Sequence, residues 1–507
     1  MNAPERRWPT LLRGRGNVET SDLRHDFTAS LVVFLVALPL CVGVAVASGV
    51  PAELGLVTGI VGGLLTGLLP GSSLQVSGPA AGLTVLVYEA VQEYGLPLLG
   101  VIVLTAGLLQ LLMGALRLGR WFRAISVAVV EGMLAGIGLV LIAGQLYSMA
   151  DTKAPSGGLE KITGLPDMLF DTARSGSAQA AFALGAGTIA VLVLWRRLPA
   201  PARIVPAPLA AVALATSASM LLRPPVAKIE VQGLQGAVQP PDVADFGELA
   251  GVGLIGTVLA FTLIASAESL FSAAAVDRLH DGQRTDYDKE LMAQGAGNTL
   301  CGVLGALPMT AVIVRSAANV QAGAKTKASR VLHGVWLLLF AALLPAALGV
   351  IPLAALAGVL VHAGCKLIPL AALRQLWRGH RGEALILVVT AVAIVAVSMF
   401  EGVLIGLALA VVKTAWDTSH VRVDVIDKGA GPIQAHLTGN ATFLRLPKIL
   451  DALEALPQDR PIEVHMSGLR HLDHACRTSL ENWAARHSAE GVEPVRVNAR
   501  PEPGPAG

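Results

Sequence analysis

Charged side chains are scarce in this sequence. Asp, Glu, Lys and Arg make up 15% of its 507 residues, whereas soluble domains carry about 25%. Hydrophobic residues make up 53%, and the mean hydropathy is +0.63. This composition excludes an ordinary soluble protein and indicates a polytopic protein of the lipid bilayer. The net charge is only +2, and no basic stretch is interleaved with aromatic residues, so we expect no nucleic-acid partner.

Cysteine and catalytic constellations are equally sparse. The chain has four cysteines, and none of them shows a metal-ligand or disulfide spacing. We interpret them as small apolar side chains. No nucleophile–base pair and no metal-binding set is visible, so we expect neither an enzyme nor a resident cofactor. The cysteines are Cys41, Cys301, Cys365 and Cys476.

Fourteen apolar segments follow an Arg-rich N-terminal tail of residues 1–24. A break at 223–250 divides them seven and seven, and an odd number per repeat requires two repeats that are inverted in the membrane. We therefore expect an all-α transmembrane domain over 25–419, with repeats at about 25–222 and 251–419. The segments lie at about 26–48, 53–69, 79–94, 97–117, 122–147, 178–198, 204–222, 251–276, 290–306, 310–322, 330–349, 351–372, 383–399 and 401–417.

The basic residues predict the topology of these segments. Their clusters follow even-numbered segments, on the side of the Arg-rich N-terminus, and the positive-inside rule places that side in the cytoplasm. Both termini and the loop at 277–289 are then cytoplasmic, and the loops at 148–177 and 223–250 lie outside the plasma (inner) membrane. The clusters are Arg117, Arg120 and Arg123; Arg196, Arg197 and Arg203; Lys325, Lys327 and Arg330; and Arg374, Arg378 and Arg381.

The third segment of each repeat is interrupted by proline. About a dozen residues lie between Leu307 and Asn319, too few for a span, which needs about 20. We expect two half-helices with buried N-termini, opened by Pro79 and Pro308 at equivalent places, since proline suits a first helical turn. Paired interrupted segments are typical of a transporter's binding site. The alternative is two kinked helices that span the membrane fully.

Free backbone N–H groups at the N-termini of such half-helices would form an anion site. Small side chains there would let a small anion approach the backbone. The predicted substrate-binding residues are Ser77, Gly78, Pro79, Ala80, Ala81 and Gly82 in the first half, and Ala311, Val312, Ile313 and Arg315 in the second.

Two of the ionisable residues within the apolar segments are candidates for the binding site. Arg315 would strengthen the positive field of the half-helix N-termini; the alternatives are a structural pair with Glu268 or a side chain that reaches the interface. Glu268 and Ser272 are four residues apart, on one helix face, and could bind Na⁺ as a coupling ion, with Ala311 and Ile313 as further ligands. Alternatively, Glu268 takes up a proton or is held by Arg315 for structure.

The pattern changes at residue 420 to that of a small soluble α/β domain, which ends at about 498. Strand-like alternation and helical spacing follow each other there. Strands are expected at 421–426, 462–466 and 495–497, and helices at 443–456 and 476–487. The Pro- and Gly-rich residues 499–507 predict a disordered tail.

Several motifs in order make the chain similar to a known family. It resembles the SulP anion permeases, bacterial relatives of solute carrier family 26, over about residues 20–498, and its C-terminal part looks like a STAS domain. The resemblance implies a core domain (spans 1–4 and 8–11), a gate domain (spans 5–7 and 12–14) and a homodimer. The motifs are Leu35-Val-Ala-Leu-Pro, Val76-Ser-Gly-Pro-Ala-Ala and Asn319-Val-Gln-Ala-Gly-Ala-Lys-Thr-Lys.

Within this family, the chain is most similar to the group associated with carbonic anhydrase and bicarbonate. The resemblance implies a secondary active transporter of a small inorganic anion, bicarbonate first and sulfate second, that works by alternating access. It also implies carbonic anhydrase as a partner. The alternatives are an anion channel of the same fold, a proton-coupled anion or dicarboxylate symporter, and a membrane scaffold. The phrases concerned are Ser77-Gly-Pro-Ala-Ala-Gly-Leu-Thr, Leu307-Pro-Met-Thr-Ala-Val-Ile-Val-Arg-Ser and Leu472-Asp-His-Ala-Cys.

Two positions depart from the family pattern. Leu40 stands where many members carry an acidic or amide residue suspected of proton coupling, so proton coupling is not expected there. Asp473 is followed by His474, where many STAS domains carry a phosphorylatable Ser or Thr. We therefore expect no phosphorylation switch at this position, and we expect Na⁺ rather than a proton to couple to the anion.

The predicted topology can be tested by labelling a single cysteine on a cysteine-free background. Glu160→Cys, in the loop at 148–177, should react with a membrane-impermeant maleimide from outside the cell, because an even number of spans separates the two cytoplasmic termini. A cysteine at Asp281 is the matched control for the cytoplasmic side. Labelling of position 160 from the cytoplasmic side alone would contradict the arrangement of seven plus seven spans.

Overall fold

A computed structural model describes nine stretches of the chain, namely residues 20–124, 126–155, 157–199, 205–231, 233–250, 252–429, 431–457, 460–490 and 495–498. Residues 1–19 of the predicted N-terminal tail, Arg203 and the predicted tail at 499–507 lie outside these residues. The chain divides into two compact units, residues 1–406 and 407–507.

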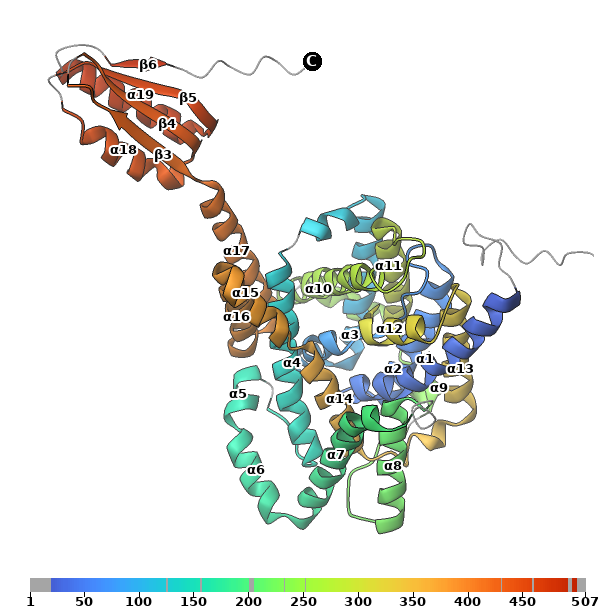
Figure 1. The fold of residues 1–507 in the computed structure, drawn as a ribbon. Helices are drawn as coiled ribbons and strands as arrows, with labels where there is room; N and C mark the ends of the chain where they lie inside the picture. Colours follow the sequence, from blue (N-terminus) through green and yellow to red (C-terminus); the bar gives the residue numbers. More distant parts are fainter. Residues whose placement is uncertain are drawn as a thin grey trace, which may run out of the picture. The chain divides into compact units, whose positions relative to one another are not determined.

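The first unit is built almost entirely of helices (Figure 1). In chain order its elements are α1 (Thr20–Ala47), α2 (Ala52–Val61), the π-helical turn η2 (Gly62–Thr66), β1 (Ser77–Pro79), η3 (Ala81–Leu83), α3 (Thr84–Ala115), η4 (Gly119–Ala124), α4 (Val127–Met149), α5 (Gly158–Thr163), α6 (Leu165–Arg174), α7 (Gly176–Leu194), η5 (Trp195–Arg197), α8 (Ala207–Leu222), α9 (Leu234–Ala237), η7 (Val243–Ala250), α10 (Val252–Val276), α11 (Tyr287–Val303), β2 (Met309–Ala311), α12 (Ile313–Gln321), α13 (Ala328–Leu343), η8 (Pro345–Ala347), α14 (Leu353–Leu367), α15 (Leu370–Gly379) and α16 (Arg381–Ala396). The next helix, α17 (Met399–Thr418), contains the boundary between the units.

Each of the fourteen predicted apolar segments contains a helix. The segments at 79–94 and 97–117 share α3, which is kinked where Gly95 adopts a φ of +83° ahead of Pro97. Among the described residues, seven helices are long and apolar enough to cross a membrane, and several apolar helices are shorter. The structure therefore agrees with a polytopic membrane protein, while the count of fourteen spans and the inverted repeats stay predictions.

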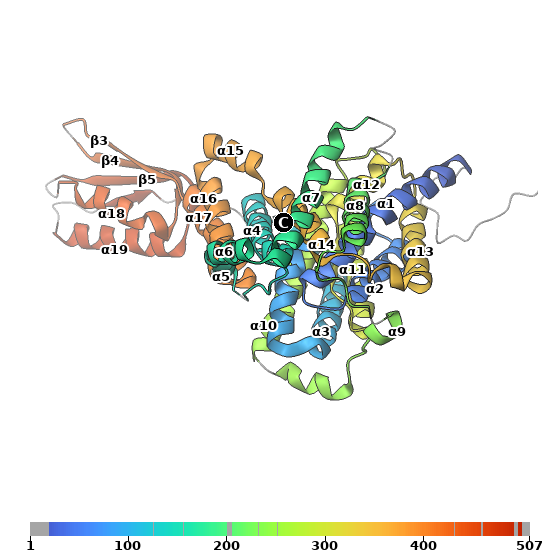
Figure 2. The ribbon, with the colours of Figure 1, turned by 90° about the horizontal axis from the view of Figure 1, so that it is seen from below.

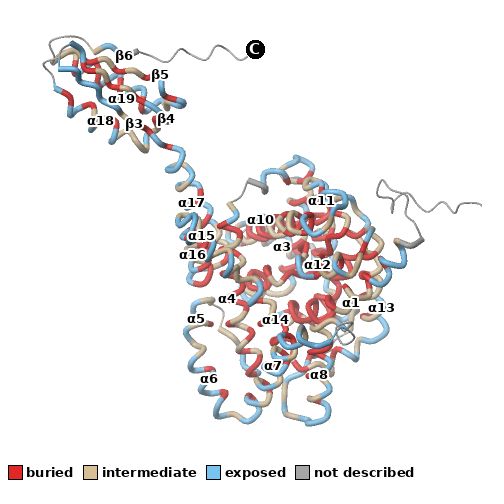
Figure 3. Tube along the Cα trace, in the orientation of Figure 1, coloured by how far each residue is buried: buried red, intermediate tan, exposed pale blue. Residues whose placement is uncertain are grey.

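The helices of the first unit pack in a few dominant pairs. The helix α3 packs along α11 and α10, and α1 packs against α13 and α2. The helix α4 packs with α14 and α16, and α14 also packs with α7. Figure 3 shows the buried stretches gathered in the middle of this unit, around α1, α2, α4 and α11. The helices α1, α2, α10 and α11 pack against the two short strands, β1 and β2. The two strands correct the all-α description of this part of the chain.

The second unit is a small α/β structure. Its elements are β3 (Val421–Ile426), β4 (Ile433–Ala441), η9 (Phe443–Arg445), α18 (Leu446–Glu454), β5 (Ile462–Leu472), α19 (His474–Glu490) and β6 (Arg496–Asn498). The strands form one sheet in the order β3-β4-β5-β6, antiparallel between β3 and β4 and parallel in the other two pairs. Both helices lie on the same face of this sheet (Figure 2), where the unit has its own apolar core.

The predicted strands and helices of this unit are confirmed, but the sequence analysis missed β4. Its buried residues alternate as a strand requires: Ile433, Ala435 and Leu437 face the core. The pattern is weak in the sequence because Ala and Gly have low strand propensity. Gly439 marks an irregularity of the ladder, with a φ of +100° that favours glycine.

Asp473 connects α19 to the end of β4. Its Oδ1 accepts a hydrogen bond of 2.7 Å from the N–H of Cys476, in the first turn of α19, and its Oδ2 accepts one of 2.6 Å from the N–H of Phe443. Burial by itself would raise the pKa of the Asp473 carboxyl. The hydrogen bonds from Cys476 and Phe443 favour the ionised form and outweigh burial, so the pKa lies below its usual value.

Asp473→Ala should lower the unfolding free energy of the second unit by about 1 kcal/mol, since it removes the side-chain cap of α19. A carboxyl group whose pKa is lower in the folded state stabilises the fold at pH values above its pKa in the unfolded state, which is about 3.9 for Asp. This stabilisation is lost as the pH falls through the lower folded-state value. The unfolding free energies of the wild type and the variant should therefore differ at neutral pH and converge in strong acid.

Hydrogen exchange of peptides from β4 and α19 in the full chain measures this difference at neutral pH, and acid titration of circular dichroism follows the convergence. The exposed neighbour His474→Ala is the control, and equal exchange rates in Asp473→Ala and His474→Ala would contradict the capping role.

Candidate functional site

The predicted anion-binding residues lie on two buried segments that pair as β-strands. In the antiparallel ladder between β1 and β2, Ser77 lies opposite Ala311, Gly78 opposite Thr310 and Pro79 opposite Met309. All residues of both strands are buried. The structure thus brings together two parts of the chain that are more than 200 residues apart in sequence.

Helices begin directly after both strands. After β1, Ala80 precedes η3, which leads into α3; after β2, Val312 precedes α12. Because the ladder is antiparallel, the two helices leave it from opposite ends. The prediction of two interrupted segments with helix starts inside the protein therefore agrees with the structure.

The predicted role of Pro308 in the first helical turn is wrong. Pro308 precedes β2 and lies five residues before Ile313, where α12 begins. Pro79 is the last residue of β1, so by position along the strands its counterpart is Ala311 and not Pro308. The reason is that the prolines adjoin the strands: a residue without an N–H cannot donate to the ladder, so prolines are found at strand ends.

Two of the backbone N–H groups predicted to face the anion are already bonded. The N–H of Ala311 donates to Ser269 Oγ (3.3 Å), and the N–H of Val312 donates to the carbonyl of Val76 (2.9 Å). In this structure neither N–H group is free to donate to an anion, and the part of Ala311 and Val312 in substrate binding stays a prediction. A membrane-embedded strand has no water to satisfy its backbone, so the protein itself provides the partners.

Backbone N–H groups without a partner in their own helix lie one or two residues further along each of the two segments. In α12 the N–H of Ser316 is bonded back to the carbonyl of Val312 (3.0 Å), so helix geometry leaves the N–H groups of Ile313 and Val314 without a partner in their own helix. The Ile313 and Val314 side chains are 41% and 42% exposed. On the other side, the Ala81 and Gly82 N–H groups hold the equivalent place, because Leu83 is the first to bond back, to Ala80 (3.2 Å).

Arg315 joins α12 to the opposite strand. It is 1% exposed, and its Nη2 donates to the carbonyl of Pro79 (3.2 Å). A Cβ atom at Gly78 would come within 2.2 Å of Arg315 Nη1, so glycine at position 78 makes room for the guanidinium. The Nε and Nη1 atoms have no hydrogen-bond partner among the residues that the structure describes. Arg315 is therefore a buried positive group with unused donors beside the ladder.

Glu268 of α10 lies at the start of the other helix. A Cβ atom at Gly82 would come within 2.6 Å of Glu268 Oε1, and Glu268 Oε2 has no hydrogen-bond partner in the described part of the chain. Arg315 and Glu268, both described, form no ion pair; Arg315 lies against Gly78 and Pro79 of β1, and Glu268 lies against Gly82 of η3. The alternative that Arg315 and Glu268 hold each other, and the alternative that Arg315 reaches the interface, are therefore wrong.

The other residues predicted for a cation site fit it unequally. Ser272 is buried one turn beyond Glu268 on α10, and the unpaired Oε2 of Glu268 suits an oxygen ligand for a hard cation. Ile313 fits less well, because it opens α12 and a helical carbonyl accepts a hydrogen bond from the residue four positions later. No group of three His, Cys, Asp or Glu residues that could hold a metal ion occurs among the described residues.

A row of amides and a carboxylate on α11 holds both strands, and sequence reasoning missed it. Glu290, Gln294 and Asn298 are four residues apart and buried, so they share one helix face. Gln294 Nε2 donates to Ser77 Oγ and to Glu290 Oε1, both at 2.7 Å. Asn298 Oδ1 accepts from the N–H of Met309 (2.7 Å). Polar residues at this spacing in an apolar segment were the available signal.

The segment before β1 is held by α12 and α13. Ser316 Oγ accepts from the N–H of Val76 (2.9 Å), and Asn319 Nδ2 donates to the carbonyl of Leu74 (2.9 Å). Arg330 Nη1 of α13 donates to the carbonyl of Gln75 (3.1 Å). Asn319, which opens one of the motifs in the sequence, therefore has a structural role beside the ladder.

Comparison with known proteins gives consistent relatives. The profile of the sulfate permease family matches residues 23–390. The bicarbonate transporter BicA of Picosynechococcus sp. is 26% identical, over 80% of this chain and 72% of its own length. The putative sulfate transporter YbaR of Bacillus subtilis is 23% identical, over 93% of this chain and 94% of its own.

Solved structures show the same fold at low identity. The transmembrane domain of a cyanobacterial bicarbonate transporter BicA superimposes with a TM-score of 0.65 at 23% identity, over 78% of this chain and 98% of that one. The murine solute carrier 26 family member A9 anion transporter superimposes with a TM-score of 0.76 at 16% identity, over 95% of this chain and 86% of that one. Because the family profile matches most of the length of this chain, the chain belongs to the sulfate permease family, a family of membrane transporters.

Proposed function

We propose that this protein is a secondary active transporter of small inorganic anions that works by alternating access. The observation that carries the proposal is the pair of helix starts that leave one buried β-ladder, with Arg315 held against it. Helix N-termini carry a positive partial charge and unpaired N–H groups. A scaffold would not need such a site in the interior of a membrane protein.

The proposed anion site lies at the helix starts and not on the strands. Ala81, Gly82, Ile313 and Val314 offer backbone N–H groups there, and Arg315 adds a full positive charge that is not paired with a carboxylate among the described residues. Low dielectric surroundings strengthen this attraction. Ala81 is only half-buried, so a small anion can approach its backbone, whereas Ala311 is fully buried and its N–H is bonded.

Bicarbonate is our first choice of substrate and sulfate the second. The similarity to bicarbonate transporters, in sequence and in fold, supports the first choice, and the similarity to proteins named as sulfate transporters supports the second. We further propose a homodimer in the plasma (inner) membrane with both termini in the cytoplasm. Carbonic anhydrase, which interconverts bicarbonate and carbon dioxide, is the proposed soluble partner.

Arg315→Met should weaken anion affinity by about 10- to 100-fold, because hydrogen bonds to charged groups contribute about 1.5–3 kcal/mol. Methionine keeps an apolar side chain in the buried space next to Gly78. Competition between labelled and unlabelled anion in proteoliposome uptake measures the affinity. Gly78→Ala should act in the same direction, because its Cβ atom displaces Arg315 Nη1. A folded Arg315→Met protein with the wild-type KM would place the anion elsewhere.

Ala81→Leu should block anion uptake without unfolding the protein. The added side chain would occupy the half-buried start of η3, where the anion is proposed to meet the backbone. Ala371→Leu, on an exposed position of α15, adds the same volume away from the site and serves as the control. Uptake by Ala81→Leu at the rate of Ala371→Leu, in equally monodisperse preparations, would count against the site.

Coupling to sodium is the proposed driving mechanism, with Glu268 and Ser272 as ligands of Na⁺. An anion and a nearby ionised Glu268 repel each other unless a cation lies between them, and the orphan Oε2 of Glu268 is placed to bind one. Sodium would then raise anion affinity, and the anion would raise sodium affinity by the same factor. Proton uptake by Glu268 is the alternative.

Glu268→Gln distinguishes these two mechanisms. Under sodium coupling, wild-type uptake at a fixed pH requires sodium, and the variant loses that dependence together with most transport. Under proton coupling, wild-type uptake persists without sodium and follows an imposed pH gradient. Anion uptake into proteoliposomes with independently set sodium and pH gradients is the measurement. If Glu268→Gln takes up anion like the wild type when neither gradient is present, Glu268 couples neither ion and is structural.

A further inference from the structure

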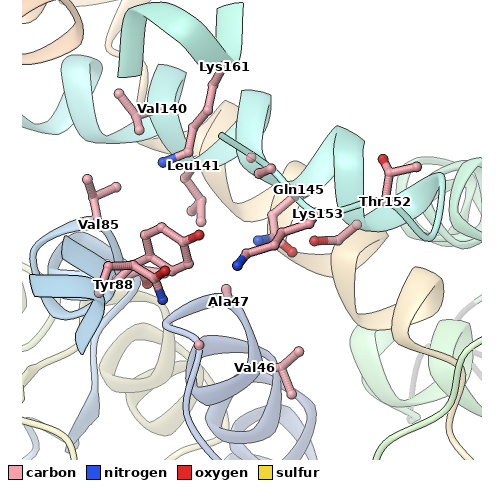
Figure 4. Close-up of a pocket in the computed structure, with 16 residues that line it drawn as sticks. Val46, Ala47, Val85, Tyr88, Val140, Leu141, Gln145, Thr152, Lys153 and Lys161 are labelled. Carbon is pink, nitrogen blue, oxygen red and sulfur yellow. The ribbon is translucent and has the colours of Figure 1, made fainter. Parts of the chain in front are cut away.

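A cavity of about 340 Å³ lies between the end of α1, the first half of α3, the end of α4 and the loop that leads into α5. Figure 4 shows side chains from all of these elements around it. The topology prediction places the 148–177 loop, and with it this side of the cavity, outside the cell. The lining residues are Val46, Ala47, Gly49, Thr84, Val85, Tyr88, Gln92, Val140, Leu141, Gly144, Gln145, Ser148, Thr152, Lys153, Ala154 and Lys161.

Two lysines give this cavity a positive charge. The amines of Lys153 and Lys161 point into it (Figure 4), and the described residues that line it include no Asp or Glu. The side chain of Lys161 is 5% exposed, and its Nζ lies 5.1 Å from the centre of the Tyr88 ring. Burial lowers the pKa of the Lys161 amine, and two carboxylates outside the lining, those of Glu89 and Glu160, oppose this shift and favour the charged form. Lys153, by contrast, is exposed at the mouth.

The uncharged part of the lining provides hydrogen-bond donors. Gln92 and Gln145 contribute side-chain amides, and Ser148 and Thr152 contribute hydroxyl groups. Amides and hydroxyls can replace part of the hydration shell of a small oxyanion. The cavity therefore combines positive charge with neutral donors, which is the lining that a hydrated small anion requires.

One lining residue of the cavity adjoins the proposed anion site. Thr84, which lines the cavity, is the first residue of α3 and follows η3 directly. Its hydroxyl group lies 3.5 Å from the carbonyl of Ala80. Thr84 is thus within one helical turn of Ala81 and Gly82 along the chain.

We propose that this cavity is an access chamber that binds the transported anion before it reaches the helix starts, with Lys153 and Lys161 as its binding residues. The inference rests on the proposed function as an anion transporter. Its ligand is a small inorganic anion, bicarbonate or sulfate.

The physical role of the lysines is to concentrate the anion. A cleft lined by charge of one sign, with walls of low dielectric, focuses the electrostatic field and raises the local concentration of the opposite ion. This attraction is screened by salt, since the Debye length falls from about 10 Å at 0.1 M to about 3 Å at 1 M ionic strength. Removing the lysines should therefore change KM in a salt-dependent way and leave the maximal rate nearly unchanged.

The test measures uptake of labelled bicarbonate and sulfate from outside by cells that express the full chain. At low ionic strength, the KM of the double variant Lys153→Gln/Lys161→Gln should be about fivefold higher than that of the wild type. Near 1 M salt, the two KM values should differ by less than about twofold. Lys228→Gln removes one exposed positive charge in the 223–250 segment, outside the cavity lining, and is the matched control. It should leave KM unchanged.

Charge restoration separates binding from a structural effect. Lys153→Cys, with the exposed Cys365 replaced by Ser, can be modified by a thiosulfonate that carries either a trimethylammonium or a sulfonate group. The cationic reagent should return KM toward the wild-type value, and the anionic reagent should raise it further.

The outcomes distinguish this inference from the proposed function. An unchanged KM in the double variant, an equal change in Lys228→Gln, or equal effects of the two reagents would overturn the access chamber while normal anion uptake upheld the transporter. If the wild-type chain took up neither anion in a saturable way, the proposed function would fail and the chamber would fail with it.

Discussion

The structure of the first unit depends on the need to pair backbone N–H and C=O groups inside a membrane protein. Two segments of the chain leave helical geometry at β1 and β2, where no water is available to them in the bilayer. Each provides the other's partners through one short antiparallel ladder. At the end where Ser77 pairs with Ala311, the ladder is completed by Ser269, which accepts from Ala311, and by Val76, which accepts from Val312. At the other end, Asn298 accepts from Met309. The helices around the ladder provide the remaining partners.

This pairing explains why so many polar side chains are buried in a chain that is poor in polar residues. Gln294 and Asn298 of α11 and Ser316 of α12 all contact strand residues or the segment before them. Each such bond replaces water that the bilayer excludes, and an unpaired group there would cost free energy. The polar residues of the interior therefore hold two unwound segments in place.

The unpaired groups carry the chemistry of the proposed site. Among the described residues, Arg315 has donors without partners and Glu268 has an oxygen without a partner. The two side chains lie against Gly78 and Gly82, which belong to the same interrupted segment. A structural ion pair would have neutralised both. Without such a pair, a positive and a negative group remain next to the same backbone segment, which is the arrangement on which the proposed coupling depends.

The sequence by itself determined the class of protein, the helical segments and the two interrupted places, because hydrophobicity, proline and glycine act locally along the chain. It also placed the strands and helices of the second unit, apart from β4, whose Ala and Gly weaken the pattern. Only the tertiary structure decided which donors remain open. Ser269 and Val76 take up the N–H groups of Ala311 and Val312, the strand register moves the helix start away from Pro308, and Arg315 is directed to Pro79 and not to Glu268. These contacts join residues that are 42 or more positions apart, and no local pattern contains them.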